Sequence, residues 1–113
     1  MTPSELQAAA TAVLRDAAAL VRRAWCQGAN ARDAAGYSVG PSEVLAARWC
    51  AQGAIQRAAS DLLPEFAPLY ASVPIAFQRL HHVVRMPISA WNDHRERTAE
   101  EVVAALLFAA GVK

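Results

Sequence analysis

The sequence predicts an all-α fold, a compact bundle of about four main helices with two ordered irregular loops. Hydrophobic residues make up 55% of the 113-residue chain but aromatic residues only 7%, a composition that favours closely packed helices over a β-sandwich. Capping-box motifs mark helix starts, and apolar residues recur at intervals of three and four. No long linker separates two cores, so residues 1–113 are expected to form a single helical domain.

The first helix is predicted to begin at Pro3 and to run to about Cys26. Thr2 is the expected N-cap, and Glu5 can complete a capping box with it. Apolar residues follow at helical spacing: Leu6, Ala10, Val13, Ala17, Leu20, Val21 and Ala24. Gly28 is well placed to end this helix.

Residues 29–40 interrupt the helical periodicity with polar residues and glycines. A loop of this length exceeds what packing alone requires, so it is a candidate functional element. A small hairpin over residues 33–39, turning around Gly36, is one expectation for it.

A second helix is predicted over residues 41–60, because Pro41 and Glu43 repeat the start signals of the first helix. Its segment 46–59 is apolar and is expected to be the element against which the rest of the chain packs. Gly53 costs roughly 1 kcal/mol inside a helix. We therefore expect another chain segment to approach the helix closely at that point.

Prolines interrupt the chain after residue 61. A short helical turn is expected at residues 64–71, followed by a third helix at about 74–85 with Ser72 as its cap. The inner face of this helix is predicted to carry Phe77, Leu80, His81 and Val84.

Residues 86–97 form the second irregular loop, and Thr98 with Glu101 then provides another capping box. The last helix is predicted to run to Ala110, with Gly111 beyond it. It is apolar nearly all round. Either it lies deep in the domain or one face, from Val102 to Ala110, meets a second copy of the chain.

Eleven basic and ten acidic residues give a formal charge of +1, which disfavours a nucleic-acid-binding accessory role. No basic segment followed by an apolar one opens the chain, and no stretch resembles a membrane span, so a cytoplasmic protein with no membrane partner is expected. In that compartment the two cysteines, Cys26 and Cys50, would be kept reduced.

Three short motifs resemble an uncharacterised family of small bacterial and phage-associated proteins, described only as a domain of unknown function. The first runs from Trp25 through Gln27-Gly28-Ala29 to Arg32-Asp33, the second is Trp49-Cys50 with Gly53-Ala54, and the third is Trp91-Asn92-Asp93. Cys26 and His94 do not belong to the pattern, and residues 62–85 carry no part of it. The resemblance transfers no activity, but it implies that the two loops and the second helix form one unit.

A cysteine-dependent hydrolase or transferase is the enzymatic alternative. Cys50 would attack a carbonyl, His81 or His82 would act as base, and Asn92 or Asp93 would orient the imidazole. The predicted second helix weighs against this enzymatic alternative. A helix N-terminus would lower the pKa of a thiol, but Cys50 lies about ten residues from that end.

No metal site and no cofactor are predicted. Ligand types are present at Cys26, Cys50, His81, His82 and His94, but none of the paired spacings of a zinc site occurs.

A ligand site remains open as a hypothesis around the two loops. Its candidate residues are Arg32, Asp33, Trp49, Trp91 and Asn92. The alternative for the three tryptophans is structural: Trp25, Trp49 and Trp91 would brace the loops against the second helix through their indole N–H groups.

No combination of residues defines a reaction. The leading interpretation is therefore a small non-enzymatic interaction module with a protein partner, forming a homo-oligomer through its C-terminal helix.

Overall fold

The computed structural model describes residues 2–62 and 70–112, which form five α-helices and a small three-stranded sheet. The helices are α1 (Pro3–Arg23), α2 (Ala51–Leu62), α3 (Ser72–Val84), α4 (Ile88–Asn92) and α5 (Ala99–Ala109). The strands are β1 (Ala31–Arg32), β2 (Ser38–Val39) and β3 (Arg48–Trp49). The fold is thus mostly helical, as predicted, but it is not purely all-α.

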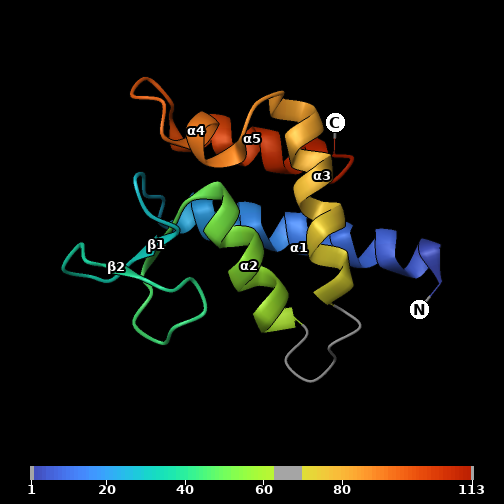
Figure 1. The fold of residues 1–113 in the computed structure, drawn as a ribbon, viewed down its shortest axis with the longest axis horizontal. Coiled ribbons are helices and arrows are strands. Elements are labelled where there is room, and N and C mark those ends of the chain that lie inside the picture. The colour runs from blue at the N-terminus through green and yellow to red at the C-terminus, as the bar shows by residue number, and fades with distance from the viewer. Residues whose placement is uncertain (1, 63–69, 113) are drawn as a thin grey trace.

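Helix α1 is the centre of the domain. It lies along the long axis of the molecule and packs against α2, α3 and α5 (Figure 1). Its buried face carries Ala10, Val13, Leu14, Ala17, Ala18 and Val21. The prediction that residues 46–59 would form the central element is therefore wrong, although α2 packs directly on α1.

Both capping boxes predicted from the sequence are present. The Thr2 hydroxyl accepts a hydrogen bond from the Glu5 N–H, and the Glu5 carboxylate accepts one from the Thr2 N–H. Thr98 and Glu101 make the same reciprocal pair at the start of α5. These bonds satisfy N–H groups that the first turn of a helix leaves free.

Helix α1 ends earlier than predicted. Its C-cap is Ala24, whose backbone is extended (φ −162°, ψ 103°), and Gly28 lies in the loop beyond. The extended backbone aligns Trp25 with Trp49 as an isolated parallel β-bridge. Pairing with another chain segment, and not a glycine cap, ends this helix.

The first irregular loop folds into the predicted hairpin and recruits a third strand. Strand β1 pairs with β2 on one side and with β3 on the other, both antiparallel, so that Ala31 faces Val39 and Trp49. The sheet forms one end of the molecule, where it projects beside α2 (Figure 1).

The prediction of a helix from residue 41 is wrong for its first ten residues. The N–H groups of Glu43 and Ala46 close tight turns onto Gly40 and Glu43, and the Ala47 N–H donates to the Arg32 carbonyl of β1. Val44 is 94% exposed and Leu45 is 68% exposed, so the two large apolar side chains of residues 41–47 lie outside the core. The start signals at Pro41 and Glu43 are used in a turn.

Two smaller predictions also change. Ser72 is the first residue of α3 and not its cap, which is Ala71 without a side-chain hydrogen bond. The short helix α4 forms inside the second predicted loop. The helical turn predicted at residues 64–71 falls mostly outside the described residues.

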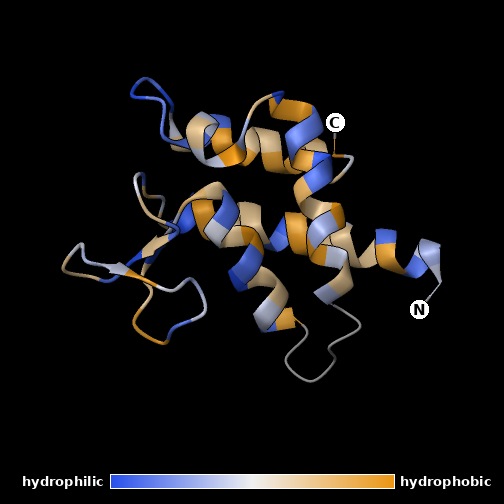
Figure 2. Ribbon diagram, in the orientation of Figure 1, coloured by the Kyte–Doolittle hydropathy of each residue, from blue (hydrophilic) through white to orange (hydrophobic). Residues whose placement is uncertain are grey.

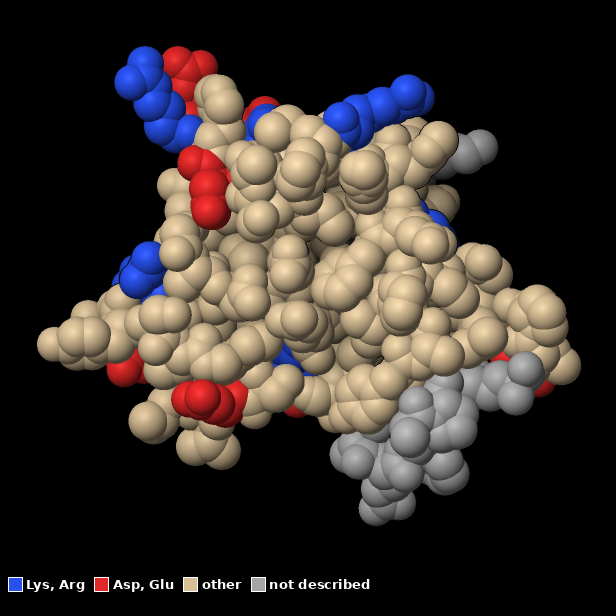
Figure 3. Space-filling model, viewed as in Figure 1, with Lys and Arg blue, Asp and Glu red and all other residues tan. Residues whose placement is uncertain are grey.

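The core is mostly aliphatic and rich in alanine. Hydrophobic and hydrophilic residues alternate along the helices (Figure 2). On the face shown in Figure 3, charged side chains gather near the rim and the middle is uncharged. No helix in the described part of the chain is long and apolar enough to cross a membrane.

Candidate functional site

A network of buried polar groups joins the three sequence motifs. At its centre is Asn92, which is fully buried. Its Oδ1 accepts hydrogen bonds from Trp25 Nε1 (2.8 Å) and the Ala51 N–H (3.0 Å). Its Nδ2 donates to the Cys26 carbonyl (3.1 Å) and to Asp93 Oδ1 (3.0 Å). The side chain therefore holds the end of α1, the start of α2 and the end of α4 together.

Gln27 and Gly28 extend this network from the first loop. Gln27 Nε2 donates to the carbonyls of Asn92 (3.0 Å) and His94 (2.9 Å), and the Gly28 N–H donates to Asp93 Oδ1 (2.9 Å). We call this group the polar junction; it comprises Trp25, Gln27, Gly28, Ala51, Asn92 and Asp93. The unit implied by the family resemblance is thus built from hydrogen bonds between the motifs.

The candidate ligand residues Arg32 and Asp33 shape the hairpin. The Arg32 guanidinium donates to the Gln27 carbonyl through Nε (3.2 Å) and Nη2 (3.0 Å), and to the Gly36 carbonyl through Nη1 (2.8 Å). Asp33 Oδ1 accepts from the N–H groups of Ala35 and Tyr37. The Arg32 guanidinium and the Oδ1 atom of Asp33 therefore bind the backbone of the loop.

Trp49 and Trp91 also have partners inside the domain. Trp49 Nε1 donates to the Pro41 carbonyl (3.0 Å), and the Arg57 guanidinium lies 5.3 Å from the centre of the Trp49 ring. The Arg97 guanidinium stacks 4.1 Å from the centre of the Trp91 ring. The indole N–H groups of Trp25 and Trp49 thus bind other segments, as the bracing role predicts, whereas the contact described for the Trp91 ring is with Arg97.

Cys50 lies immediately before α2, and not ten residues inside a helix as the sequence suggested. Its sulfur accepts a hydrogen bond from the Gly53 N–H (3.3 Å), in the first turn of α2. Cys50 is 2% exposed. Burial raises the pKa of its thiol, although hydrogen bonds from the Gly53 and Gln52 N–H groups act in the opposite direction.

The residues of the hydrolase alternative are distributed unevenly. Asn92 and Asp93 belong to the polar junction beside Cys50, whereas His81 and His82 are exposed on α3. The prediction that His81 lies on the inner face of its helix is therefore wrong. Among the described residues no hydrogen bond joins Cys50 to either histidine, and no group of three His, Cys, Asp or Glu side chains could hold a metal ion.

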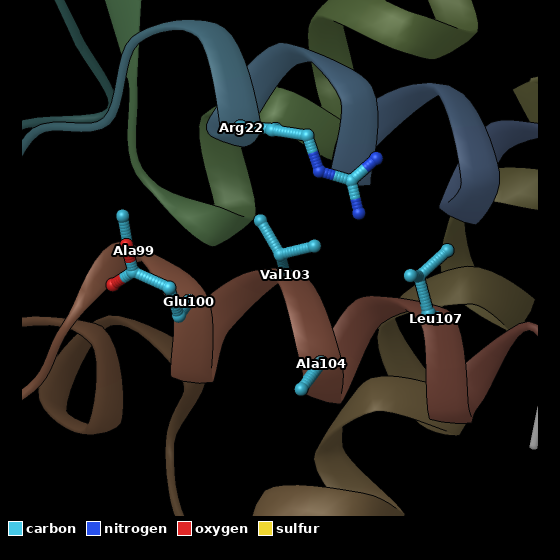
Figure 4. Close-up of a pocket in the computed structure, with 6 residues that line it drawn as sticks. All are labelled: Arg22, Ala99, Glu100, Val103, Ala104 and Leu107. Atoms are coloured by element: carbon cyan, nitrogen blue, oxygen red, sulfur yellow. The ribbon is translucent and has the colours of Figure 1, made fainter.

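A shallow apolar groove lies between α1 and α5. Its volume is about 320 Å³, and its walls are Arg22, Ala99, Glu100, Val103, Ala104 and Leu107. Figure 4 shows the Arg22 side chain leaning from α1 over the groove towards the Leu107 end, while Glu100 lies at the other end. In the described residues the ion pairs are Arg57–Asp61 and Arg97–Glu101, so neither Arg22 nor Glu100 has an intramolecular ionic partner there.

The outer side of α5 continues this groove. Ala104, Leu107 and Phe108 follow one another at helical spacing, and Phe108 is 66% exposed. The sequence of α5 is apolar nearly all round, and this pattern predicts an exposed apolar surface on the helix. The sequence does not predict that Arg22 and Glu100 are the charged ends of the groove, because only the packing of α1 on α5 brings these two residues together.

Comparison with known protein families shows which family the chain belongs to. Residues 6–112 match the sequence profile of a family of unknown function (DUF6197). The chain belongs to this family. No curated protein and no solved structure is detectably similar to it.

Proposed function

We propose that this member of the DUF6197 family is a non-enzymatic interaction module that self-associates through the groove between α1 and α5. The observation that carries the proposal is the groove itself, an apolar strip with a positive charge and a negative charge at its two ends, neither of which has an ionic partner among residues 2–62 and 70–112. Exposed apolar strips with polar rims are characteristic of protein interfaces.

Charge complementarity supports a second copy of the chain as the partner. In a two-fold symmetric dimer each protomer offers the same surface, and residue i of one contacts residue j of the other reciprocally. If the two α5 helices pack antiparallel about Ala104, Glu100 of each protomer approaches the Leu107 end of the other groove, where Arg22 lies. Two ion pairs then frame a contact made by Ala104, Leu107 and Phe108.

The way the domain uses its polar residues supports a binding role over a catalytic one. Asn92 and Arg32 are committed to internal hydrogen bonds and Cys50 is buried, while the candidate bases His81 and His82 lie exposed on α3. A nucleophilic thiol must be reachable by substrate and ionise readily. The raised pKa and the burial of Cys50 work against both requirements.

The mass of the protein in solution tests this proposal. Sedimentation or light scattering at micromolar concentration is expected to give twice the mass of one chain. Ala104→Glu, which places a charge in the centre of the apolar strip, is expected to give the mass of one chain while the circular dichroism spectrum stays helical.

Charge exchange tests the antiparallel arrangement. Arg22→Glu and Glu100→Arg should each weaken dimerisation about tenfold, because each puts like charges opposite one another. The double variant restores opposite charges and should recover the wild-type dissociation constant. Glu96→Arg, an exposed acid outside the groove, is the control. A wild-type mass of one chain up to ~100 μM, which corresponds to a standard free energy of only about −5 kcal/mol, would reject self-association.

A further inference from the structure

Cys26 and Cys50 lie side by side on neighbouring chain segments. The Trp49 N–H donates to the Ala24 carbonyl (3.0 Å), and the Cys26 N–H donates to the Trp49 carbonyl (3.2 Å). These two bonds define the parallel bridge between Trp25 and Trp49. One residue further along each segment are the two cysteines, which are therefore in register.

This register suits a disulfide. In-register residues on adjacent strands place their side chains on the same face, with Cα atoms roughly 4.8 Å apart. Disulfides are formed between residues whose Cα atoms are about 4.4–6.8 Å apart. Burial and, second to it, the neighbouring Cys50 raise the pKa of the Cys26 thiol to about 11. The contribution of Cys50 agrees with the proximity of the two sulfurs.

The two sulfurs have only weak partners to give up. Cys26 Sγ lies 3.6 Å from the Ala29 carbonyl, and Cys50 Sγ lies 3.8 Å from Asn30 Oδ1. The firmest contact is the hydrogen bond that Cys50 Sγ accepts from the Gly53 N–H, and a disulfide sulfur can still accept it weakly. Both cysteines are free thiols in this structure.

We propose that Cys26 and Cys50 form a site of reversible disulfide formation that responds to peroxide and locks the end of α1 to the start of α2. The thiolate of one cysteine attacks a peroxide oxygen, the O–O bond breaks, and a sulfenic acid forms with release of one water after protonation. The second sulfur then attacks the sulfenic sulfur, an S–S bond forms, and a second water leaves. The two sulfurs are oxidised by two electrons in total, and hydrogen peroxide is reduced to water.

Burial determines which oxidant can act. Cys26 is 7% exposed and Cys50 is 2% exposed, so a peroxide reaches them more readily than a bulky disulfide reagent. The low thiolate fraction makes the reaction slow at neutral pH and faster as the pH rises. A small thiol reductant reverses it by thiol–disulfide exchange.

The test treats the folded, reduced protein with hydrogen peroxide at mildly alkaline pH, then denatures it and alkylates the remaining thiols. The expected product has lost the mass of two hydrogen atoms, takes up no alkylating reagent and contains a linked peptide pair spanning Cys26 and Cys50. Reduction before alkylation should restore both thiols. The closed loop should raise the melting temperature on the order of 10 °C.

Cys26→Ser and Cys50→Ser are the matched controls, because serine fits the space and can still donate or accept at each site. Neither variant is expected to show the intramolecular mass loss or the rise in melting temperature. Addition of two or more oxygen atoms to wild-type cysteines without loss of two hydrogens would overturn the proposal. Disulfide-linked dimers in place of the intramolecular bond would overturn it as well.

Discussion

The polar junction and the outer side of α5 use their residues in opposite ways. At the junction the side chains of Trp25, Gln27 and Asn92 are bound to partners inside the domain. On α5, Ala104 and Phe108 face outwards, and the charges that flank the groove have no intramolecular ionic partner in the described residues.

This difference shows that the residues that suggest a site in the sequence are not the residues that are exposed to a binding partner. Tryptophan, asparagine and glutamine at the junction are the side chains that first suggest a binding site, yet each of them completes a hydrogen bond inside the domain. Their distinctiveness reflects the fold. Alanine, leucine and phenylalanine on α5 are ordinary in a sequence, yet their exposed side chains remain free to contact a partner.

The largest expected effect is the loss of the central amide at the junction. Asn92→Ala removes the acceptor for Trp25 Nε1 and the Ala51 N–H and the donor to the Cys26 carbonyl. Several buried polar groups are then left unpaired, and the free energy of unfolding should fall by about 4 kcal/mol. Urea denaturation measures this change.

Asn30→Ala is the control for that prediction. Asn30 is exposed, and in the described part of the chain its side chain makes only the weak contact with Cys50 Sγ. Its loss should change the free energy of unfolding by less than about 0.5 kcal/mol. Equal effects of the two substitutions would erase the distinction between the junction and the surface.

Gly53→Ala tests how closely the first loop approaches α2. In an ordinary helix this change stabilises by about 1 kcal/mol. Here a Cβ atom at Gly53 would overlap the backbone carbonyl oxygen of Asn30, which accepts the Cys50 N–H. We expect destabilisation of about 3 kcal/mol by overpacking, measured by denaturant unfolding.

Gly111→Ala is the matched glycine substitution outside the junction. No atom lies near the space that its Cβ would occupy, but its φ of 88° is strained for alanine. The expected cost is about 1 kcal/mol. A stabilising Gly53→Ala substitution would show that the loop does not approach α2 as described.

The last prediction is a pH dependence at Cys26, which changes stability only at alkaline pH. Burial and then Cys50 raise the pKa of this thiol from its ordinary 9.0 to about 11 in the folded protein. The folded state therefore holds the proton more tightly than the unfolded state. The stability contribution of the protonated thiol is complete below pH 9.0 and is lost as the pH rises towards 11.

Denaturant unfolding of wild type and Cys26→Ser under reducing conditions measures this dependence. The advantage of wild type over the variant should shrink progressively across that window. Parallel curves for the two proteins would contradict the raised pKa.

Local signals in the sequence predicted the helices that begin with side-chain caps. Thr2 and Thr98 sit next to the backbone groups that they bind, so the starts of α1 and α5 follow from residues within three positions. Pro41 and Glu43 carry similar signals but lie in a turn, because the Ala47 N–H pairs with the Arg32 carbonyl. A tertiary hydrogen bond decides between the two outcomes, and periodicity does not report it.

The candidate site was predictable only in its composition. The resemblance grouped the residues around Trp25, Trp49 and Trp91, and these segments do meet. Apart from the adjacent Asp93, the partners of the Asn92 side chain are separated from it by 41 to 67 positions along the chain, and no local pattern encodes such pairs. The groove could not be predicted from the sequence either, because Arg22 and Glu100 come together only when α1 packs on α5.

The contact between α1 and α5 also governs when the domain can form during synthesis. Pro3–Arg23 leave the ribosome early, but the side of α1 that α5 covers stays exposed until Ala99–Ala109 have followed. The closing contact therefore spans most of the chain, which slows folding relative to a bundle closed by neighbouring helices. During that interval the side of α1 that α5 later covers is apolar surface in contact with solvent, which is the kind of surface through which partly folded chains associate.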